Sequence, residues 1–224
     1  MPRSIDVRGT FLAIAVVALA PSTGGAQSLF ERLNLDRLRL TALGAAAGPV
    51  RPSRVEETEL YSVFADYGAI ARSWRVVFSA TYWGSHFREE VVRELEDRLR
   101  AEVIDPSGDD TLDLGRIAVS DIALEVDLRY TPRPSAVVRA YAGGGLGAHI
   151  INAESPFIAD TFVESALDNI SAGFAAFVGM DTAPVGRLSL GLHARMNMLS
   201  NVRFWSARAL VTYFFGAEPP SSPP

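Results

Sequence analysis

A run of alternating side chains at residues 120–130, SDIALEVDLRY, constrains the fold more than any other feature of the chain. Every second position is apolar from Ile122 to Tyr130, and the other positions from residue 121 onward include four charged side chains: Asp121, Glu125, Asp127 and Arg129. Because successive side chains of a β-strand point to opposite faces, the run predicts a strand with one apolar and one charged face. In a soluble sandwich the charged face would meet water, whereas in a membrane barrel the apolar face would meet lipid and the charged face the lumen.

Seven further segments show the same alternation with varying clarity. We expect these strands at residues 37–43, 59–67, 73–84, 136–150, 170–180, 187–197 and 204–215. The fifth strand in chain order, 136–150, is rich in glycine, and its alternation does not fix which side chains face inward. Strands of about 9–12 residues are long enough to cross a bilayer when tilted.

The connections between these strands alternate in length. Longer links are expected at residues 48–58, 87–110 and 152–169, and shorter ones near Gly68 and at 131–135 and 181–186, although the last hairpin is also tight. Transmembrane barrels have short turns on one rim and longer loops on the other, and a sandwich has no reason to sort its loops in this way. The alternation therefore favours an eight-stranded antiparallel transmembrane up-and-down barrel, an all-β fold. The first strand would begin, and the last strand would end, on the periplasmic side.

The longest link contains an amphipathic segment, REEVVRELEDRLRAEV at residues 88–103. Apolar residues recur every four positions, and three acid-before-base pairs share that spacing: Glu89–Arg93, Glu94–Arg98 and Glu96–Arg100. This pattern predicts a helix in a long extracellular loop.

The N-terminal segment has the layout of a secretory signal peptide. Arg3 and Arg8 precede an apolar run at residues 11–20, and small residues before Gln27 suit a cleavage site. We therefore expect a signal peptide at 1–26, a barrel domain at 27–216, a disordered Pro-rich tail at 217–224, and a bacterial outer-membrane location after cleavage. The chain has no cysteine, and its formal charge of −5 argues against non-specific nucleic-acid binding.

Two groups of side chains are the candidate functional residues. Aromatic residues near the ends of lipid-facing stripes are expected to form membrane-interface girdles: Trp74, Tyr82, Tyr130, Trp205, Tyr213 and Phe215. Charged and polar residues of the opposite faces are expected to form a lumen network: Glu125, Asp127, Arg129, Arg139, His193, Arg195 and Arg208. In this prediction the charges of strand 120–130 meet Arg139 on the following strand. The network is either a structural plug or the lining of a narrow path for small solutes, because eight strands leave a lumen just wide enough for side chains.

The chain resembles the small eight-stranded outer-membrane barrel family, the OmpA/OmpX-like β-barrel domain. The resemblance covers residues 33–215 and depends on the signal peptide, the final strand ARALVTYFF, and a Tyr-x-Gly-x-Gly-x-Gly strand formed by Tyr141, Gly143, Gly145 and Gly147. Family members commonly stop at the terminal aromatic residue, whereas here GAEPPSSPP follows Phe215. The resemblance implies outer-membrane lipid and the barrel assembly machinery as partners, and an extracellular ligand as a possible partner of the loops.

The motifs that could indicate an enzyme or a cofactor are weak. GGGLGA at residues 143–148 matches a dinucleotide fingerprint, but no helix pattern follows it. The three histidines lack metal-ligand spacing. In HARMNMLSN, Ser200 lies seven residues after His193, which does not suit the serine–histidine pair of a lipid A deacylase. We predict a non-enzymatic envelope or surface protein without cofactor or metal. The alternatives are a small pore for water or small solutes, a lipid-facing enzyme, and a soluble sandwich or lipocalin-like binder.

Overall fold

The computed structural model describes residues 38–71, 73–102, 114–132, 137–155, 169–200 and 202–216. The signal peptide and the Pro-rich tail predicted from the sequence lie outside these residues. Eight strands and one helix follow each other in this order: β1 (Ala42–Pro52), β2 (Thr58–Ala71), β3 (Trp74–His86), α2 (Glu89–Glu102), β4 (Ala118–Tyr130), β5 (Val138–Glu154), β6 (Asn169–Thr182), β7 (Leu188–Leu199) and β8 (Arg203–Phe214).

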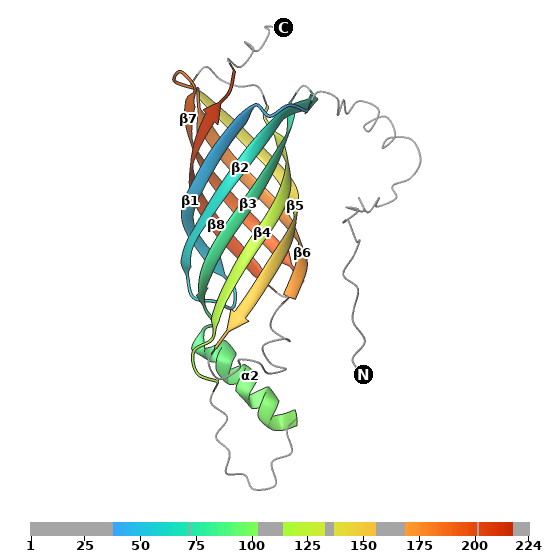
Figure 1. Cartoon of the computed structure of the whole chain (residues 1–224), viewed down its shortest axis with the longest axis vertical. Helices are drawn as coiled ribbons and strands as arrows, with labels where there is room; N and C mark the ends of the chain where they lie inside the picture. Colours follow the sequence, from blue (N-terminus) through green and yellow to red (C-terminus); the bar gives the residue numbers. More distant parts are fainter. Residues whose placement is uncertain are drawn as a thin grey trace, which may run out of the picture. The chain divides into compact units, whose positions relative to one another are not determined.

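The strands form a closed barrel in which every strand pairs antiparallel with its neighbours in the sequence (Figure 1). Closure comes from β1 and β8, which pair from Ala42 opposite Phe214 to Pro52 opposite Phe204. A closed ring leaves no sheet edge, so its backbone N–H and C=O groups pair within the barrel, as a hydrocarbon environment requires. The predicted all-β, eight-stranded antiparallel up-and-down barrel is confirmed.

The alternation in β4 separates two environments. Its odd-numbered side chains from Val119 to Arg129 are buried in the lumen, and its even-numbered side chains from Ile122 to Tyr130 are exposed on the outer surface. The glycine-rich strand β5 has the same phase, because Tyr141 and His149 are buried and Leu146 and Ile150 are exposed. The facing of β5, which the sequence left open, is therefore odd-numbered residues inward.

The two ends of the barrel differ in the length of their connections. We call the end that carries connections 72–73, 131–137 and 183–187, with the start of β1 and the end of β8, the short-turn rim. The opposite end carries connections 53–57, 87–117, 155–168 and 200–202, and we call it the loop rim. Gly186, with φ of 65°, lies in the β6–β7 turn, where a backbone conformation that favours glycine lets the chain reverse.

The first strand was predicted in the wrong place. The sequence suggested residues 37–43 and a link from residue 48, but β1 runs from Ala42 to Pro52. This stretch is ALGAAAGPVRP, whose small residues hide the alternation. They are small because neighbouring elements approach closely: a Cβ on Gly44 would lie 2.2 Å from the Phe64 ring, and one on Gly48 would lie 2.0 Å from the Ala207 carbonyl oxygen.

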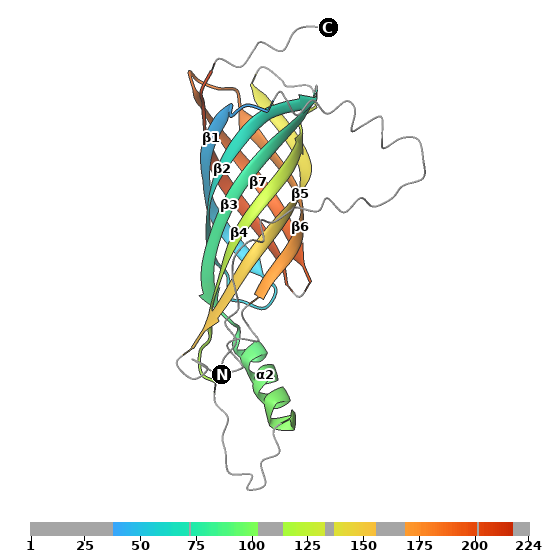
Figure 2. The same ribbon diagram turned by 45° about the vertical axis from the view of Figure 1, so that its right-hand side comes forward.

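Helix α2 extends beyond the loop rim (Figure 2). Its apolar face packs on the connection that returns to the barrel, where Val92, Leu114, Ile117 and Ala153 form a buried cluster. On its exposed surface, Arg93 binds Glu89 at 2.9 Å, Arg98 binds Glu94, and Arg100 lies 3.9 Å from Glu96. The predicted helix and its ion pairs are thus present. Within the described residues, no helix is long and apolar enough to cross a membrane.

Candidate functional site

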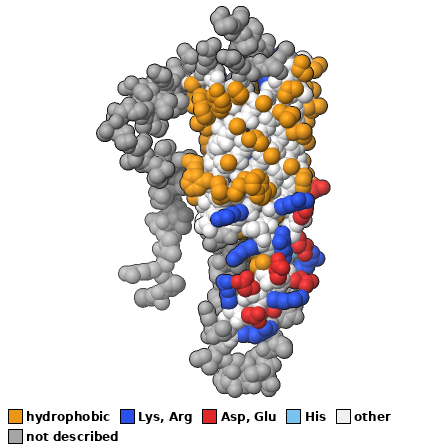
Figure 3. Space-filling view, turned by 180° about the vertical axis from the view of Figure 1, so that it is seen from behind, with side chains coloured by type: hydrophobic (Ala, Val, Ile, Leu, Met, Phe, Trp, Pro, Cys, Tyr) orange, Lys and Arg blue, Asp and Glu red, His pale blue; other side chains and the backbone are white. Residues whose placement is uncertain are grey.

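The outer wall of the barrel is apolar. Large hydrophobic side chains on all eight strands are exposed there, including Phe174 at 62%, Leu190 at 60% and Leu124 at 59%. Seen from behind, hydrophobic side chains are spread over the barrel wall, and acidic and basic side chains gather mainly at and beyond its loop end (Figure 3). A monomeric soluble protein rarely exposes so continuous an apolar surface, so this belt indicates contact with lipid.

The six predicted interface aromatics lie on this outer surface or at its edge, each between 39% and 58% exposed. Near the short-turn rim, Trp74 packs on Tyr130 with ring centroids 5.0 Å apart, and Tyr213 on Phe215 at 5.7 Å. Phe215 follows the last residue of β8 and is not part of the strand. Tyr82 and Trp205 lie toward the loop ends of β3 and β8. The aromatics therefore occur toward both edges of the apolar belt.

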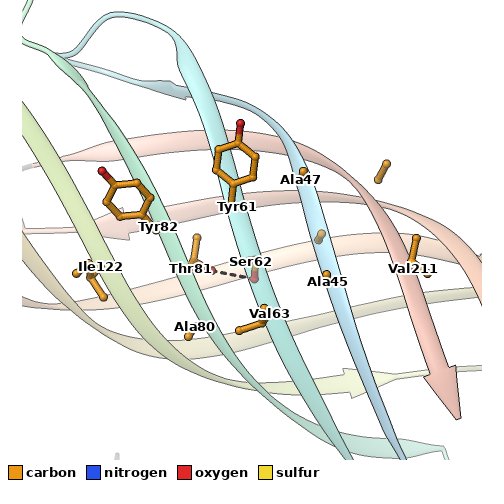
Figure 4. Close-up of a pocket in the computed structure, with 12 residues that line it drawn as sticks. Ala45, Ala47, Tyr61, Ser62, Val63, Ala80, Thr81, Tyr82, Ile122 and Val211 are labelled. Carbon is orange, nitrogen blue, oxygen red and sulfur yellow. Dashed lines mark hydrogen bonds between the residues drawn. The ribbon is translucent and has the colours of Figure 1, made fainter.

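Between these aromatic positions the wall has a shallow hollow over β8, β1, β2 and β3 (Figure 4). Its lining includes small side chains, among them Ala45, Ala47 and Ala80, and the rings of Tyr61 and Tyr82 project beside them. Behind this wall, on the lumen side, the Thr81 and Ser62 hydroxyls are hydrogen-bonded to each other at 3.2 Å. Apolar and polar side chains are thus separated by the thickness of one sheet.

The lumen holds five carboxylates and five guanidiniums among the described residues. The carboxylates belong to Asp66, Asp121, Glu125, Asp127 and Asp181, and the guanidiniums to Arg75, Arg129, Arg139, Arg195 and Arg208. Burial of an isolated charge is costly, whereas opposite charges in contact offset much of that cost. The equal numbers make the formal charge of these ten groups zero.

Arg195 on β7 is the centre of this network. Its Nη2 donates to Glu125 Oε1 at 2.8 Å, its Nη1 to Asp127 Oδ2 at 2.7 Å, and its Nε to Asn197 Oδ1 at 2.9 Å. The side chains of Arg195 and Glu125 are each only 1% exposed. The planar guanidinium uses its fixed fork of donors to connect strands β4 and β7 across the lumen.

Glu125 is also bound from the opposite side. Its Oε2 accepts hydrogen bonds from the hydroxyls of Ser79 and Thr81 on β3, each at 3.2 Å. Arg208 on β8 is buried near this network, and its Nε donates to Ser206 at 3.1 Å. Side chains of β3, β4, β7 and β8 therefore meet in one polar layer.

The predicted meeting of the β4 acids with Arg139 is wrong. The register places Arg139 opposite Asp181, whereas Glu125 and Asp127 lie opposite Gly147 and Gly145 of β5. Arg139 is half-buried nearer the short-turn rim, with its guanidinium 5.6 Å from the centre of the Phe214 ring. The sequence indicated that the two strands are neighbours, but it did not show which of their residues face each other, because that depends on the register of pairing.

A second layer lies closer to the short-turn rim. Arg129 binds Asp181 at 3.3 Å and stacks on Tyr141, with its guanidinium 3.9 Å from the ring centre. The Tyr141 hydroxyl is hydrogen-bonded to His193 Nδ1 at 3.3 Å. At the rim itself Arg75 binds Asp66 at 2.9 Å. Three members of these contacts were not predicted from the sequence: Asp66, Arg75 and Asp181. Asp66 and Arg75 nevertheless lie on the polar faces of segments predicted to be strands.

The loop end of the lumen is closed by apolar side chains. A cluster that we call the loop-end cluster consists of Val50, Val55, Leu60, Trp83, Val119, Leu199 and Phe204, each at most 9% exposed. Phe87, Ile151 and Val202 pack against it. Side-chain exposure is higher toward the other end, reaching 16% for Asp181 and 22% for Arg75. Charged lumen side chains near the short-turn rim are thus more exposed than the apolar side chains at the loop end.

Next to this cluster, inside the lumen, lies a buried dyad that the sequence did not reveal. The carboxylate of Asp121 accepts from Trp83 Nε1 at 3.1 Å and is hydrogen-bonded to His149 Nδ1 at 2.9 Å. Ser171 is the cross-strand partner of His149, but its hydroxyl contacts Ser200 Oγ at 3.3 Å. A nucleophilic serine needs a hydrogen bond to its base, and Ser171 and His149 do not form that pair in this structure.

The glycines of β5 make room for large lumen side chains. A Cβ on Gly143 would lie 2.2 Å from the Leu128 carbonyl oxygen and 2.5 Å from the Phe177 ring, and one on Gly145 would lie 1.9 Å from Asp127 Oδ1. The GGGLGA run lies within a strand, so it lacks the helix start that a dinucleotide site requires.

The residues considered for a lipid A deacylase are also separated in the structure. His193 is 8% exposed and faces the lumen, and Ser200 lies on the loop rim. The described residues therefore do not bring this histidine and serine together on the lipid-facing wall.

Comparison with solved structures identifies the fold. Neisserial surface protein A matches with a TM-score of 0.53 and 15% identity, over 78% of this chain and 96% of that one. The chain has the fold of the small eight-stranded outer-membrane β-barrels. Two further barrels superpose more loosely. Ail, the attachment invasion locus protein of Yersinia pestis, solved with the heparin analogue sucrose octasulfate, matches with a TM-score of 0.44 and 14% identity, over 79% of this chain and 97% of that one. The outer membrane enzyme PagL matches with a TM-score of 0.39 and 11% identity, over 77% of this chain and 98% of that one.

No protein-family model and no curated protein matches the sequence. One fold can carry unrelated functions, so function has to be argued from the side chains of this barrel.

Proposed function

We propose that this chain is a non-enzymatic integral outer-membrane protein with a sealed lumen, which acts through the structure that it presents beyond its loop rim. The observation that supports this most directly is the position of Arg195, which connects two strands across the lumen through buried ion pairs. A conducting path would need a continuous column of water along the same axis.

The loop-end cluster supports the same conclusion independently of the charges. Leu60 and Val50 are 0% exposed and Phe204 is 1% exposed, so apolar atoms fill the lumen at its loop end. An apolar constriction raises the energy of an ion that has to leave water. The ion pairs of Arg195 and the loop-end cluster both favour the plug over the pore.

The large connection 87–117 supports a role at the cell surface. Helix α2 is held to the barrel end by Arg88, whose Nε donates to the Val55 carbonyl at 3.1 Å, and by Glu96, which accepts from the Leu114 N–H at 2.9 Å. These contacts connect the helix to the rim, and its outer face carries exposed ion pairs. An ordered, charged projection suits contact with an extracellular ligand rather than with lipid.

We expect the loop rim to face the outside of the cell and the short-turn rim the periplasm, as in other outer-membrane barrels. The absence of cysteine from the sequence permits a direct test. An Arg93→Cys variant, on the exposed face of α2, should react with a membrane-impermeant maleimide on intact cells. The matched Arg187→Cys variant, on the short-turn rim, should react only after the outer membrane is opened. The reverse labelling pattern would contradict the orientation.

The sealed lumen predicts an absence of conductance. Purified protein inserted into planar lipid bilayers should give no stepwise single-channel currents, because ion pairs and apolar side chains fill the lumen. Heat-modifiable migration of the same sample on a denaturing gel is the control that the barrel was folded. Reproducible conductance steps from folded protein would favour the small pore instead.

A further inference from the structure

The two rims carry opposite charge. The connections of the loop rim contain six arginines and fifteen acidic residues, whereas the three connections of the short-turn rim contain three arginines and no acidic residue. Each short turn carries one of these arginines: Arg72, Arg133 or Arg187. A charge difference along the barrel axis bears on which headgroups each rim can contact.

Arg187 is the best-defined cation of the short-turn rim. It is exposed in the β6–β7 turn, and its Nη1 donates to the phenol oxygen of Tyr213 at 3.0 Å. Tyr213 in turn packs edge-on against Phe215. The guanidinium is therefore placed next to the Tyr213 ring at the edge of the apolar belt, which is the level of lipid headgroups.

Arg39 adds a second cation close to the same edge. It precedes β1, and its backbone N–H donates to the Tyr67 carbonyl at 3.0 Å. The neighbouring Thr41 carbonyl accepts from the Phe215 N–H at 3.0 Å, so the start of β1 adjoins the end of β8. Within the described part of the chain, neither Arg39 nor Arg187 forms an ion pair with a carboxylate.

Exposed apolar side chains lie beside Arg187. Val185 is 85% exposed in the turn that carries Arg187, and Leu188 beside it is 51% exposed. Exposed apolar atoms next to an arginine that has no carboxylate partner suit a boundary where acyl chains end and phosphates begin. A purely aqueous surface would not stabilise these apolar side chains.

We propose that the outer edge of the short-turn rim around Arg39, Arg187 and Tyr213 binds the phosphate of an anionic glycerophospholipid. Arginine suits this role because its planar fork can donate to two phosphate oxygens at once. Zwitterionic headgroups present a compensating positive charge, so an anionic headgroup should be preferred. This inference depends on the membrane location proposed above.

The test uses a tryptophan reporter placed at this edge. The full chain with Trp74→Phe, Trp205→Phe and Phe215→Trp has its reporter beside Tyr213, and the remaining Trp83 is buried in the lumen, 2% exposed. The protein is folded into vesicles of phosphatidylcholine mixed with phosphatidylglycerol, one of the two lipids being brominated. Quenching of the reporter then gives the relative binding constant of the two lipids at the rim.

We expect phosphatidylglycerol to be preferred at the reporter by roughly fivefold for each arginine that contributes. The preference should fall close to one in Arg39→Gln/Arg187→Gln and should weaken at high salt, because screening shortens the reach of exposed charges. The matched variant Arg93→Gln/Arg98→Gln removes two exposed arginines of α2 and should leave the preference unchanged. Tyr213→Phe keeps the ring but removes the oxygen that positions Arg187, so it should cause a smaller loss.

Two outcomes would overturn this inference: equal binding of the two lipids by the reporter protein, or a preference that persists without Arg39 and Arg187. Failure of the proposed membrane location would look different. In that case neither brominated lipid would quench the reporter, whatever its headgroup.

Discussion

Replacement of Arg195 by alanine should lower the free energy of unfolding by about 3–5 kcal/mol, because it leaves two buried carboxylates without their cation. Glu125 and Asp127 lie 2.8 and 2.7 Å from the Arg195 guanidinium, and the side chain of Glu125 is 1% exposed. The loss can be measured by urea unfolding of the barrel in lipid vesicles, followed by tryptophan fluorescence.

Two comparisons test whether the loss of stability is specific to the buried charge of Arg195. Arg93→Ala removes an exposed arginine of α2, whose side chain is 73% accessible, and should change stability by about 0–1 kcal/mol. In a Glu125→Gln/Asp127→Asn background, removal of Arg195 should cost much less, because its two carboxylate partners no longer carry a charge that needs it. A loss of the same size in that background would show that Arg195 contributes by packing rather than by charge.

Gly143→Ala should destabilise the barrel by about 3 kcal/mol, near the upper end of the usual cost of overpacking. The added Cβ would lie 2.2 Å from the Leu128 carbonyl oxygen, a backbone atom of the neighbouring strand that cannot rotate away. It would also meet the Phe177 ring at 2.5 Å. The same unfolding measurement detects this loss.

The adjacent Gly144 is a matched control on the opposite face of β5. Its side-chain position points outward, and the nearest atom to an added Cβ is the Ala175 carbonyl oxygen at 3.2 Å. Gly144→Ala should therefore change stability by less than about 1 kcal/mol. Equal effects at the two glycines would contradict the view that β5 is glycine-rich to admit lumen side chains.

The fold could be predicted because its main signal is local. In β4, the alternation from Ile122 to Tyr130 determines which side chains share a face before any partner strand is known. The spacing of Glu89 and Arg93 likewise indicated α2 from neighbouring residues alone. The prediction failed at β1, where alanine, glycine and proline replace the larger side chains that make alternation visible.

The candidate site was predicted only in part. Glu125, Asp127 and Arg195 were assigned to the lumen, and the structure places all three there, but their mutual contacts were not foreseen. The Asp121–His149 dyad was missed because its two members lie 28 residues apart on different strands. A signal was present for Asp121, which lies on the charged face of its strand, but the glycine-rich strand of His149 did not reveal which of its side chains face inward.

The sequence by itself determined that the chain forms amphipathic strands, that their apolar faces suit lipid, and that arginines and carboxylates face the opposite way. Only the tertiary structure decided which charges meet, where apolar side chains close the lumen, and that Arg195 reaches β4 from β7. The reason is geometric: alternation depends on each strand alone, whereas contacts across the lumen depend on the pairing register of all eight strands around the closed ring.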